Sequence, residues 1–127
     1  MIVHHAIASR RVRFMIDGPG GHPWADPDAA NAVHAVGRAV AAIAQFPDAQ
    51  RAGVTVTVTR VGGGESLTSV PAHAWFDVDL RTLDHRAMAR VSQQVRQLVE
   101  RAREDTSITL RLSTEMLGDR PGGSLDV

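Results

Sequence analysis

The hydrophobic pattern of this chain switches between two periods, and the order of the switches limits the folds that it can adopt. Two stretches repeat apolar residues every three or four positions, one after Asp26 and one after Asp84, which indicates helices. The other patterned stretches are typical of half-buried strands, and they cover residues 10–17, 54–61, 74–82 and 107–113. The sequence therefore predicts the order strand, helix, strand, strand, helix, strand.

Both expected helices begin with a capping signal. Asp26 followed by Pro27 is typical of a helix start, with the aspartate as cap and the proline in the first turn. Pro47 should stop that helix at about Phe46, and Asp84 caps the second helix. The apolar stripes are Val33, Val36, Val40 and Ile43 in the first helix, and Met88, Val91, Val95, Leu98 and Ala102 in the second.

Each expected strand needs cover for one apolar face, and the helices can supply it. The natural solution is a two-layer α+β sandwich of ferredoxin-like topology, a four-stranded antiparallel sheet with both helices on one face. Its usual strand order is four, one, three, two, which places residues 54–61 at a sheet edge. A regular exposed edge invites pairing with another chain. The pattern leaves two possibilities open here, a two-fold dimer and a solvated edge.

Composition and charge narrow the class of protein. Formal net charge is zero over 127 residues, so nothing draws the whole chain to nucleic acid or to a membrane surface. The lack of cysteine excludes disulfides and fits a reducing compartment. No apolar run is long enough to span a bilayer, and no signal-peptide pattern follows Met1. We expect a cytoplasmic protein with one folded domain over 10–114, a leading segment 1–9 and an exit linker 115–127.

His22 is the most conspicuous candidate for chemistry, because "GPGGHPWADP" (18–27) places it in a turn rich in glycine and proline. A metal cluster of His22, Asp26 and Asp28 is disfavoured, since the helix start already accounts for both aspartates. No serine nucleophile elbow is present. "GGG" at 62–64 is followed by no helix, which a phosphate loop requires.

Charged residues on the expected strands have a structural explanation. Asp77 and Asp79 share one strand face with Arg81, and they should oppose Arg11 and Arg13 as cross-strand ion pairs. RNA binding on such a sheet would need exposed aromatic residues on the central strands, which are scarce here. By its residues alone, the chain is not expected to be a complete enzyme.

Three segments together resemble one family. They are "SRRVRFMIDGPGGHPWADPDAANAVHAV", "VGGGESLTSVPAHAWFDVDLRT" and "EMLGDRPGG". They are similar to the lid, or dimerisation, domain of the di-zinc metallopeptidases that include peptidase T, carboxypeptidase G, aminoacylase and carnosinase, and most of all to the peptidase T-like branch. The resemblance implies a homodimer and a parent enzyme whose separate catalytic domain binds two zinc ions and carries the general base. It implies no cofactor in this chain itself.

The resemblance also implies roles for individual residues. The histidine of the "GGH" motif, here His22, would polarise the scissile carbonyl as an oxyanion donor. Thr68, three positions before Pro71, stands where the family usually has asparagine and would contact the substrate. Arg81 would bind a substrate carboxylate, or alternatively it is a surface partner of Asp77 or Asp79.

The expected topology separates these residues. His22 and Thr68 should lie at one end of the sheet, and Arg81 at the other end beside both termini. We therefore expect Arg81 to serve the active site of its own subunit, while His22 and Thr68 reach across to that of the partner. The homodimer would form through the edge strand 54–61 and the first helix. The substrate would be a peptide or an N-acyl amino acid.

Two other functions stay open at this point. A stand-alone ferredoxin-like domain that senses a ligand or binds a protein would need His22 to be structural. A small self-contained metalloenzyme would contain stoichiometric zinc. The segment "GDRPGGSLDV" is typical of a linker and favours the lid domain.

Overall fold

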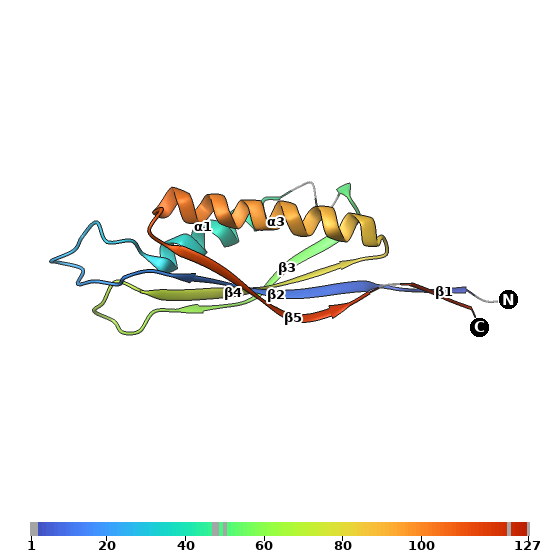
Figure 1. Cartoon of the computed structure of the whole chain (residues 1–127), viewed down its shortest axis with the longest axis horizontal. Helices are drawn as coiled ribbons and strands as arrows, with labels where there is room; N and C mark the ends of the chain where they lie inside the picture. The colour runs from blue at the N-terminus through green and yellow to red at the C-terminus, as the bar shows by residue number, and fades with distance from the viewer. Residues whose placement is uncertain (1–2, 47–48, 50, 122, 127) are drawn as a thin grey trace.

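The computed structural model describes residues 3–46, 49, 51–121 and 123–126 (Figure 1). Strands form where the pattern alternates and helices form where apolar residues repeat along one stripe. In chain order the elements are β1 (Val3–Ala6), β2 (Ala8–Asp17), α1 (Ala32–Ala44), β3 (Val54–Gly63), β4 (His73–Thr82), α3 (His85–Thr106), β5 (Arg111–Arg120) and β6 (Gly123–Asp126).

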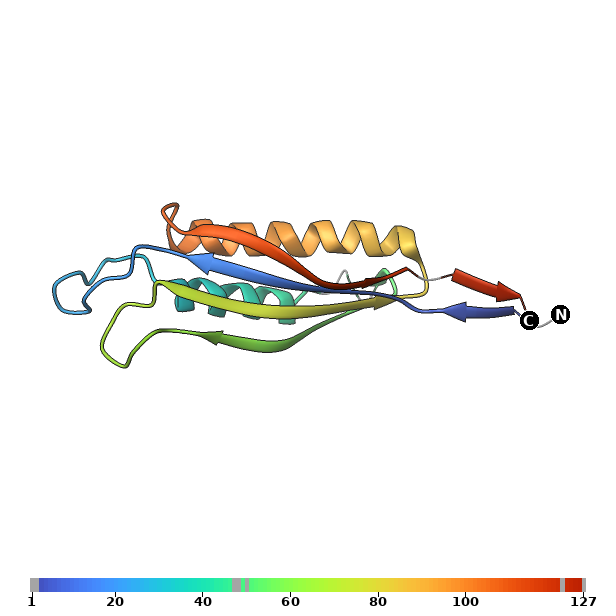
Figure 2. The same ribbon diagram turned by 60° about the horizontal axis from the view of Figure 1, so that its bottom comes forward.

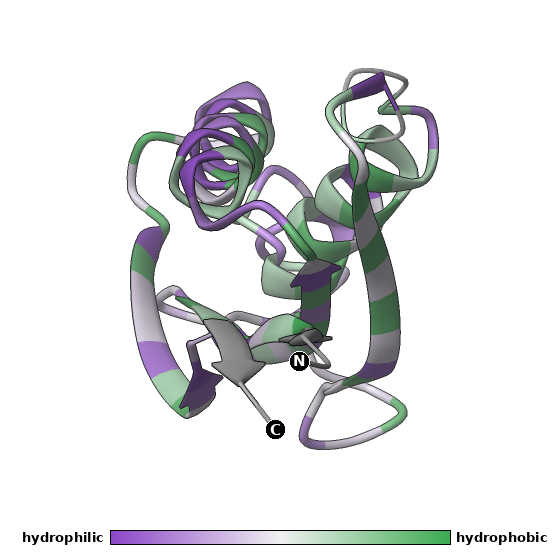
Figure 3. Cartoon of the chain, turned by 90° about the vertical axis from the view of Figure 1, so that its right-hand side faces the viewer, coloured by the Kyte–Doolittle hydropathy of each residue, from purple (hydrophilic) through white to green (hydrophobic). Residues whose placement is uncertain are grey.

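The main body has two layers, as expected. A four-stranded sheet has the order β3-β4-β2-β5, and all three pairings are antiparallel. Both α1 and α3 lie on one face of this sheet, and α3 turns its hydrophilic side away from it (Figure 3). This is the predicted α+β architecture with the predicted strand order, and β3 lies at an edge.

The core lies between the sheet and the helices. Phe14 of β2 and Phe76 of β4 stack with ring centroids 5.2 Å apart. They pack with aliphatic side chains that project from the same face of the sheet and from the buried sides of the helices. The largest fully buried side chains are Phe76, Ile16, Leu80, Leu110, Val78, Val91, Val95 and Val99.

The start of the first helix differs from the prediction. α1 begins at Ala32, and its cap is Asn31, whose side chain accepts a hydrogen bond from the backbone N–H of His34. Asp26 does not cap this helix. Its carboxylate instead accepts the N–H of His22 at 3.0 Å, so that aspartate closes the preceding turn. The helix ends at Ala44, and Pro47, the expected stop, lies outside the described residues.

The last strand of the sheet also lies further along the chain than predicted. β5 covers 111–120 and not 107–113. Arg103 of α3 donates to the carbonyl oxygens of Ile108 and Leu110, and Leu110 donates back to the carbonyl of Ser107. These bonds hold the segment after α3 as a turn, so the strand starts later and extends past residue 114.

The chain ends lie together at one end of the molecule. β1 and β6 pair as a separate two-stranded antiparallel sheet. This ribbon projects from the end of the main sheet that is opposite to the loops after β2 and β3 (Figure 2). Anything joined to the chain through its termini would therefore sit at the ribbon end.

Candidate functional site

Two loops project from the end of the sheet that is opposite to the termini (Figure 1). The first follows β2 and holds His22, and the second connects β3 to β4 and holds Thr68. An isolated antiparallel bridge joins Gly21 to Val70, with the Val70 N–H donating to the Gly21 carbonyl at 2.8 Å. The structure thus brings His22 and Thr68 to one end, as the topology predicted.

The turn around His22 selects one tautomer of its neutral imidazole ring. Nδ1 accepts hydrogen bonds from the backbone N–H groups of Trp24 at 3.2 Å and Ala25 at 3.4 Å. A ring nitrogen that accepts is unprotonated, so in neutral imidazole the proton is on Nε2. The His22 side chain is exposed, and its Nε2–H is available as a donor to a ligand.

The backbone holds the same turn tightly. The His22 carbonyl accepts the Asp26 N–H at 2.7 Å, in addition to the bond from the His22 N–H to the Asp26 carboxylate. Gly20 has a φ of 72°, a conformation that side chains other than glycine rarely adopt. The histidine is therefore presented on a rigid turn, a feature that the positioning of a catalytic group requires.

Thr68 lies in a loop that is organised by its own polar groups. The Thr68 N–H donates to Ser66 Oγ at 3.2 Å, and Ser66 Oγ lies 2.8 Å from Ser69 Oγ. Glu65 accepts the N–H groups of Ala72 and His73, which ties the loop to the start of β4. Thr68 is exposed at this loop.

Arg81 lies at the opposite end of the sheet. In the β2–β4 ladder Asp17 is opposite His73, whereas Ser9 is opposite Arg81. The eight-residue separation along β4 corresponds to about 27 Å. His22 and Arg81 of one chain therefore do not meet in one site.

Arg81 already has a partner within the chain. Its Nε donates to Asp79 Oδ1 at 2.9 Å and its Nη2 donates to Oδ2 at 3.2 Å. Asp79 also accepts from Arg11 Nε at 3.4 Å. The pair with Asp79 was the alternative prediction for Arg81, and it leaves the outer edge of the guanidinium exposed.

A second aspartate on the same face of the sheet is nearly buried. Asp77 is 3% exposed and accepts bonds from Arg13 at 2.7 and 3.0 Å and from Arg60 at 2.8 Å. The Arg13 bond was predicted, but the Arg60 bond was not. A bulge in β3 between Val58 and Arg60 turns Arg60 toward Asp77. The sequence contains a signal of this bulge, because the valines at 54, 56 and 58 are followed by a valine at 61 and not at 60.

Asp77 should make stability sensitive to acid. Arg13 first, and Arg60 after it, hold the pKa of Asp77 below its ordinary value. A carboxylate with a lowered pKa stabilises the fold above its unfolded pKa of about 4, and this contribution is lost as pH falls through the lowered value. We expect Asp77→Asn to lower the free energy of unfolding by about 1–2 kcal/mol at pH 7.

Urea unfolding at pH 7 and pH 3 tests this expectation. The difference between the natural chain and Asp77→Asn should shrink at pH 3. Asp105→Asn is the control, since it removes an exposed carboxylate from α3, which covers the opposite face of the sheet from Asp77. An equal difference at both pH values would contradict the assignment of acid sensitivity to Asp77.

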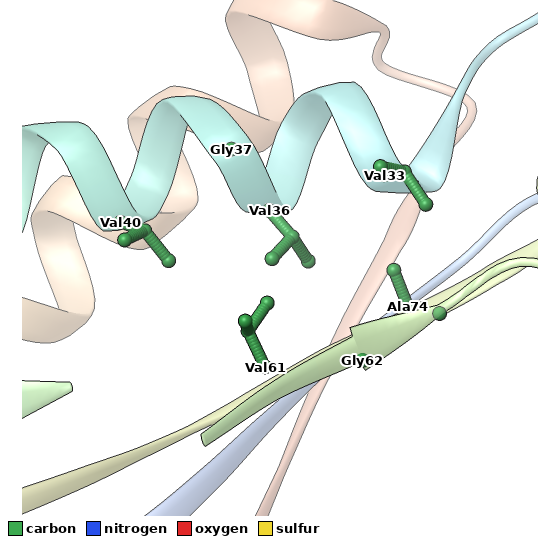
Figure 4. A pocket seen from close by; sticks show the side chains of 8 residues that line it. Val33, Val36, Gly37, Val40, Val61, Gly62 and Ala74 are labelled. Carbon is green, nitrogen blue, oxygen red and sulfur yellow. The ribbon is translucent and has the colours of Figure 1, made fainter. Parts of the chain in front are cut away.

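An apolar groove lies between α1 and the edge strand β3. Its volume is about 400 Å³. Figure 4 shows Val36 and Val40 of the helix pointing toward Val61 of the strand. Val61 is 63% exposed and Val33 is 39% exposed, so apolar surface is open here. The groove is lined by Val33, Val36, Gly37, Val40, Val61, Gly62, Gly63 and Ala74.

The described histidine and carboxylate side chains do not gather into a metal site. Within the described part of the chain, no three His, Asp or Glu side chains lie together as metal ligands. Asp26, the nearest candidate to His22, is bonded to that residue's backbone. No helix among the described residues is long and apolar enough to cross a membrane.

These features define a two-layer domain with an open edge and a histidine on a projecting turn. A family model described as a peptidase dimerisation domain matches residues 4–107. The match covers most of the sequence, and the chain belongs to the peptidase dimerisation domain family. No curated protein matches the chain.

Several solved structures share the fold. An aminobenzoyl-glutamate utilization protein from Klebsiella pneumoniae has 19% identity and a TM-score of 0.84, covering 92% of this chain and 30% of that chain. A putative amidohydrolase/peptidase from Burkholderia cenocepacia has 16% identity and a TM-score of 0.79, covering 93% and 29%. An amidase of the hydantoinase/carbamoylase family from Burkholderia vietnamiensis has 21% identity and a TM-score of 0.76, covering 96% and 30%. The chain thus spans less than a third of the length of each.

Proposed function

We propose that this chain is the dimerisation and lid domain of a zinc-dependent exopeptidase or amidohydrolase that cleaves peptide or N-acyl amide bonds. The observation that carries this proposal is the rigid His22 turn, whose Nδ1 is occupied by backbone N–H groups and whose Nε2–H is free to donate. Two of the similar structures are an amidase and a putative amidohydrolase/peptidase, which supports the class of bond cleaved. The two zinc ions would bind to a separate catalytic domain.

His22 would act by stabilising negative charge. Attack on an amide carbonyl places charge on its oxygen, and a preorganised donor lowers the energy of that state more than the energy of the substrate. The Nε2–H of neutral imidazole suits this role. Thr68, on the adjoining loop, would contact the same substrate, and Arg81 would bind a substrate carboxylate from the other end of the sheet.

The separation of these residues supports action across a dimer. Arg81 lies at the end of the sheet where β1 and β6 pair, and His22 lies at the far end. A catalytic domain joined through the termini would be near Arg81 of its own chain, so His22 and Thr68 would serve the partner. Trp24 is 89% exposed and Leu67 is fully exposed at the loop tips, which suits contact with another subunit.

The proposed homodimer pairs β3 with its copy and packs α1 against the partner. The edge from Val54 to Thr59 contains only valine and threonine, whereas β5, at the other edge, carries Arg111, Glu115, Asp119 and Arg120. Charged residues protect an edge from pairing, so β3 is the better candidate. The apolar groove beside β3 would be covered at the same time, which adds a hydrophobic contribution to association.

Gly37→Arg should separate dimerisation from folding. A Cβ added at Gly37 meets no atom of the described residues within 4 Å, and arginine favours a helix over glycine by about 0.5–1 kcal/mol. We expect the isolated natural chain to be a dimer and the variant to be a folded monomer. Light scattering coupled to gel filtration measures the mass, and circular dichroism follows unfolding.

Gly37→Ala is the matched control, because it removes the same glycine but adds only a methyl group. It should remain dimeric and be slightly more stable. A Gly37→Arg chain that stays dimeric, or a natural chain that is monomeric at tens of micromolar, would exclude the α1–β3 interface.

A further inference from the structure

The pair between Asp79 and Arg81 uses only one side of the guanidinium. Asp79 takes the Nε and Nη2 hydrogens at 2.9 and 3.2 Å. A guanidinium has a second edge, formed by Nη1 and the outer hydrogen of Nη2, which can hold another carboxylate through two parallel bonds. Among the described residues, no hydrogen bond is made by Nη1 of Arg81, whose side chain is 51% exposed.

Asp79 itself is held in place. Its side chain is 16% exposed, and Arg11 of the neighbouring strand β2 donates to its Oδ2 at 3.4 Å. Arg81, and after it Arg11, lower the pKa of Asp79, so the carboxylate stays charged through the neutral range. A charged and fixed acceptor restricts the rotamers of a long side chain that would otherwise be mobile on the surface.

The net charge around Arg81 is positive and attracts an anion. Arg11 and Arg81 contribute two positive charges and Asp79 one negative charge, so the group has a net charge of about +1. These residues alternate along their strands with buried Val78, Leu80 and Thr82, whose side chains face the helices. The free edge of Arg81 is therefore on the face of the sheet that α1 and α3 leave open.

We propose that Asp79 is a positioning residue, which orients Arg81 so that its outer Nη1–Nη2 edge receives the substrate carboxylate on the helix-free face of the sheet. This inference rests on the proposed carboxylate-binding role of Arg81. It explains how that residue can be paired within the chain and still bind substrate. It also places the substrate on the face opposite to the helices and near the β1–β6 ribbon.

The test is steady-state kinetics of Asp79→Asn in the full-length enzyme. The substrate is an N-acyl amino acid that the enzyme hydrolyses, compared with the same compound carrying a carboxamide in place of the carboxylate. Loss of orientation should raise KM for the carboxylate substrate roughly 3- to 10-fold, leave kcat within about twofold, and leave KM for the carboxamide unchanged. An equal change with both substrates, or no change with either, would overturn the positioning role.

Asp77→Asn is the matched control. Asp77 lies on the same strand face and is also held by arginines, but it does not contact Arg81. It should leave KM for both substrates unchanged. Arg11→Ala provides a second variant, and its rise in KM for the carboxylate substrate should be smaller than that of Asp79→Asn. A rise in Asp77→Asn as large as that in Asp79→Asn would also overturn the proposal.

Two further measurements distinguish the failure of this inference from the failure of the proposed function. If Arg81→Ala does not discriminate between carboxylate and carboxamide, the carboxylate-binding role of Arg81 is wrong. If Arg81→Ala discriminates but Asp79→Asn does not, only the positioning role is wrong. In the 127-residue chain, the Arg81 Nε–H resonance in NMR spectra should exchange faster with water in Asp79→Asn, and an unchanged signal would contradict the proposal.

Discussion

Replacing His22 by alanine is expected to lower kcat of the full-length enzyme roughly 100- to 1,000-fold, the usual loss for one oxyanion donor. KM should change little, because the donor acts on charge that develops in the transition state. The Nε2–H of His22 is the donor, because the backbone N–H groups of Trp24 and Ala25 donate to Nδ1 and leave the ring proton on Nε2. Steady-state kinetics with an N-acyl amino acid measure both constants.

His85→Ala is the control for this experiment. His85 is exposed at the first position of α3, and it is not placed in any site. Its removal should leave kcat within about twofold. A His22→Ala enzyme that keeps most of its kcat would show that this histidine only supports its turn, and the oxyanion role would be withdrawn.

The layer arrangement and the strand order could be predicted because they follow from local periodicity. Alternation marks the strands and fixes which face is buried, and antiparallel neighbours then follow from the order of the elements. The mispredicted helix start has a physical cause. Asp26 and Asn31 are both good caps, and the choice depends on contacts remote in the sequence, such as the Ala32 N–H bond to the Pro71 carbonyl.

The site was less predictable than the fold. The turn composition singles out His22, but the role proposed for it rests on the family resemblance, and the tautomer depends on three-dimensional contacts that no sequence pattern encodes. Arg60 reaches Asp77 only because of the bulge in β3. The alternation shifts phase there, which was a usable signal. The pairing of Arg81 with Asp79 was foreseen as an alternative, because residues two apart share a strand face.

A mixed dimer should recover activity that each parent dimer has lost. One subunit carries His22→Ala and the other carries Arg81→Ala, so either homodimer lacks one residue in both sites. If His22 acts on the partner and Arg81 acts on its own subunit, one site of the mixed dimer keeps both residues and the other keeps neither. Activity per dimer should then be about half that of the natural enzyme, far above either parent.

The geometry explains why this result is specific to a divided site. The stretch of β4 from His73 to Arg81 is about 27 Å long, and His22 lies in the loop beyond the His73 end, so the proposed partner subunit would bring the two residues to one catalytic domain. Two distinguishable affinity tags isolate the mixed species, and activity per dimer is compared with that of each homodimer. If both residues instead acted in their own subunit, the two substitutions would each disable a different site of the mixed dimer. A mixed dimer as inactive as its parents would therefore place both residues in the same subunit's site. That outcome would require the catalytic domain to approach the loop end of its own chain, away from the β1–β6 ribbon.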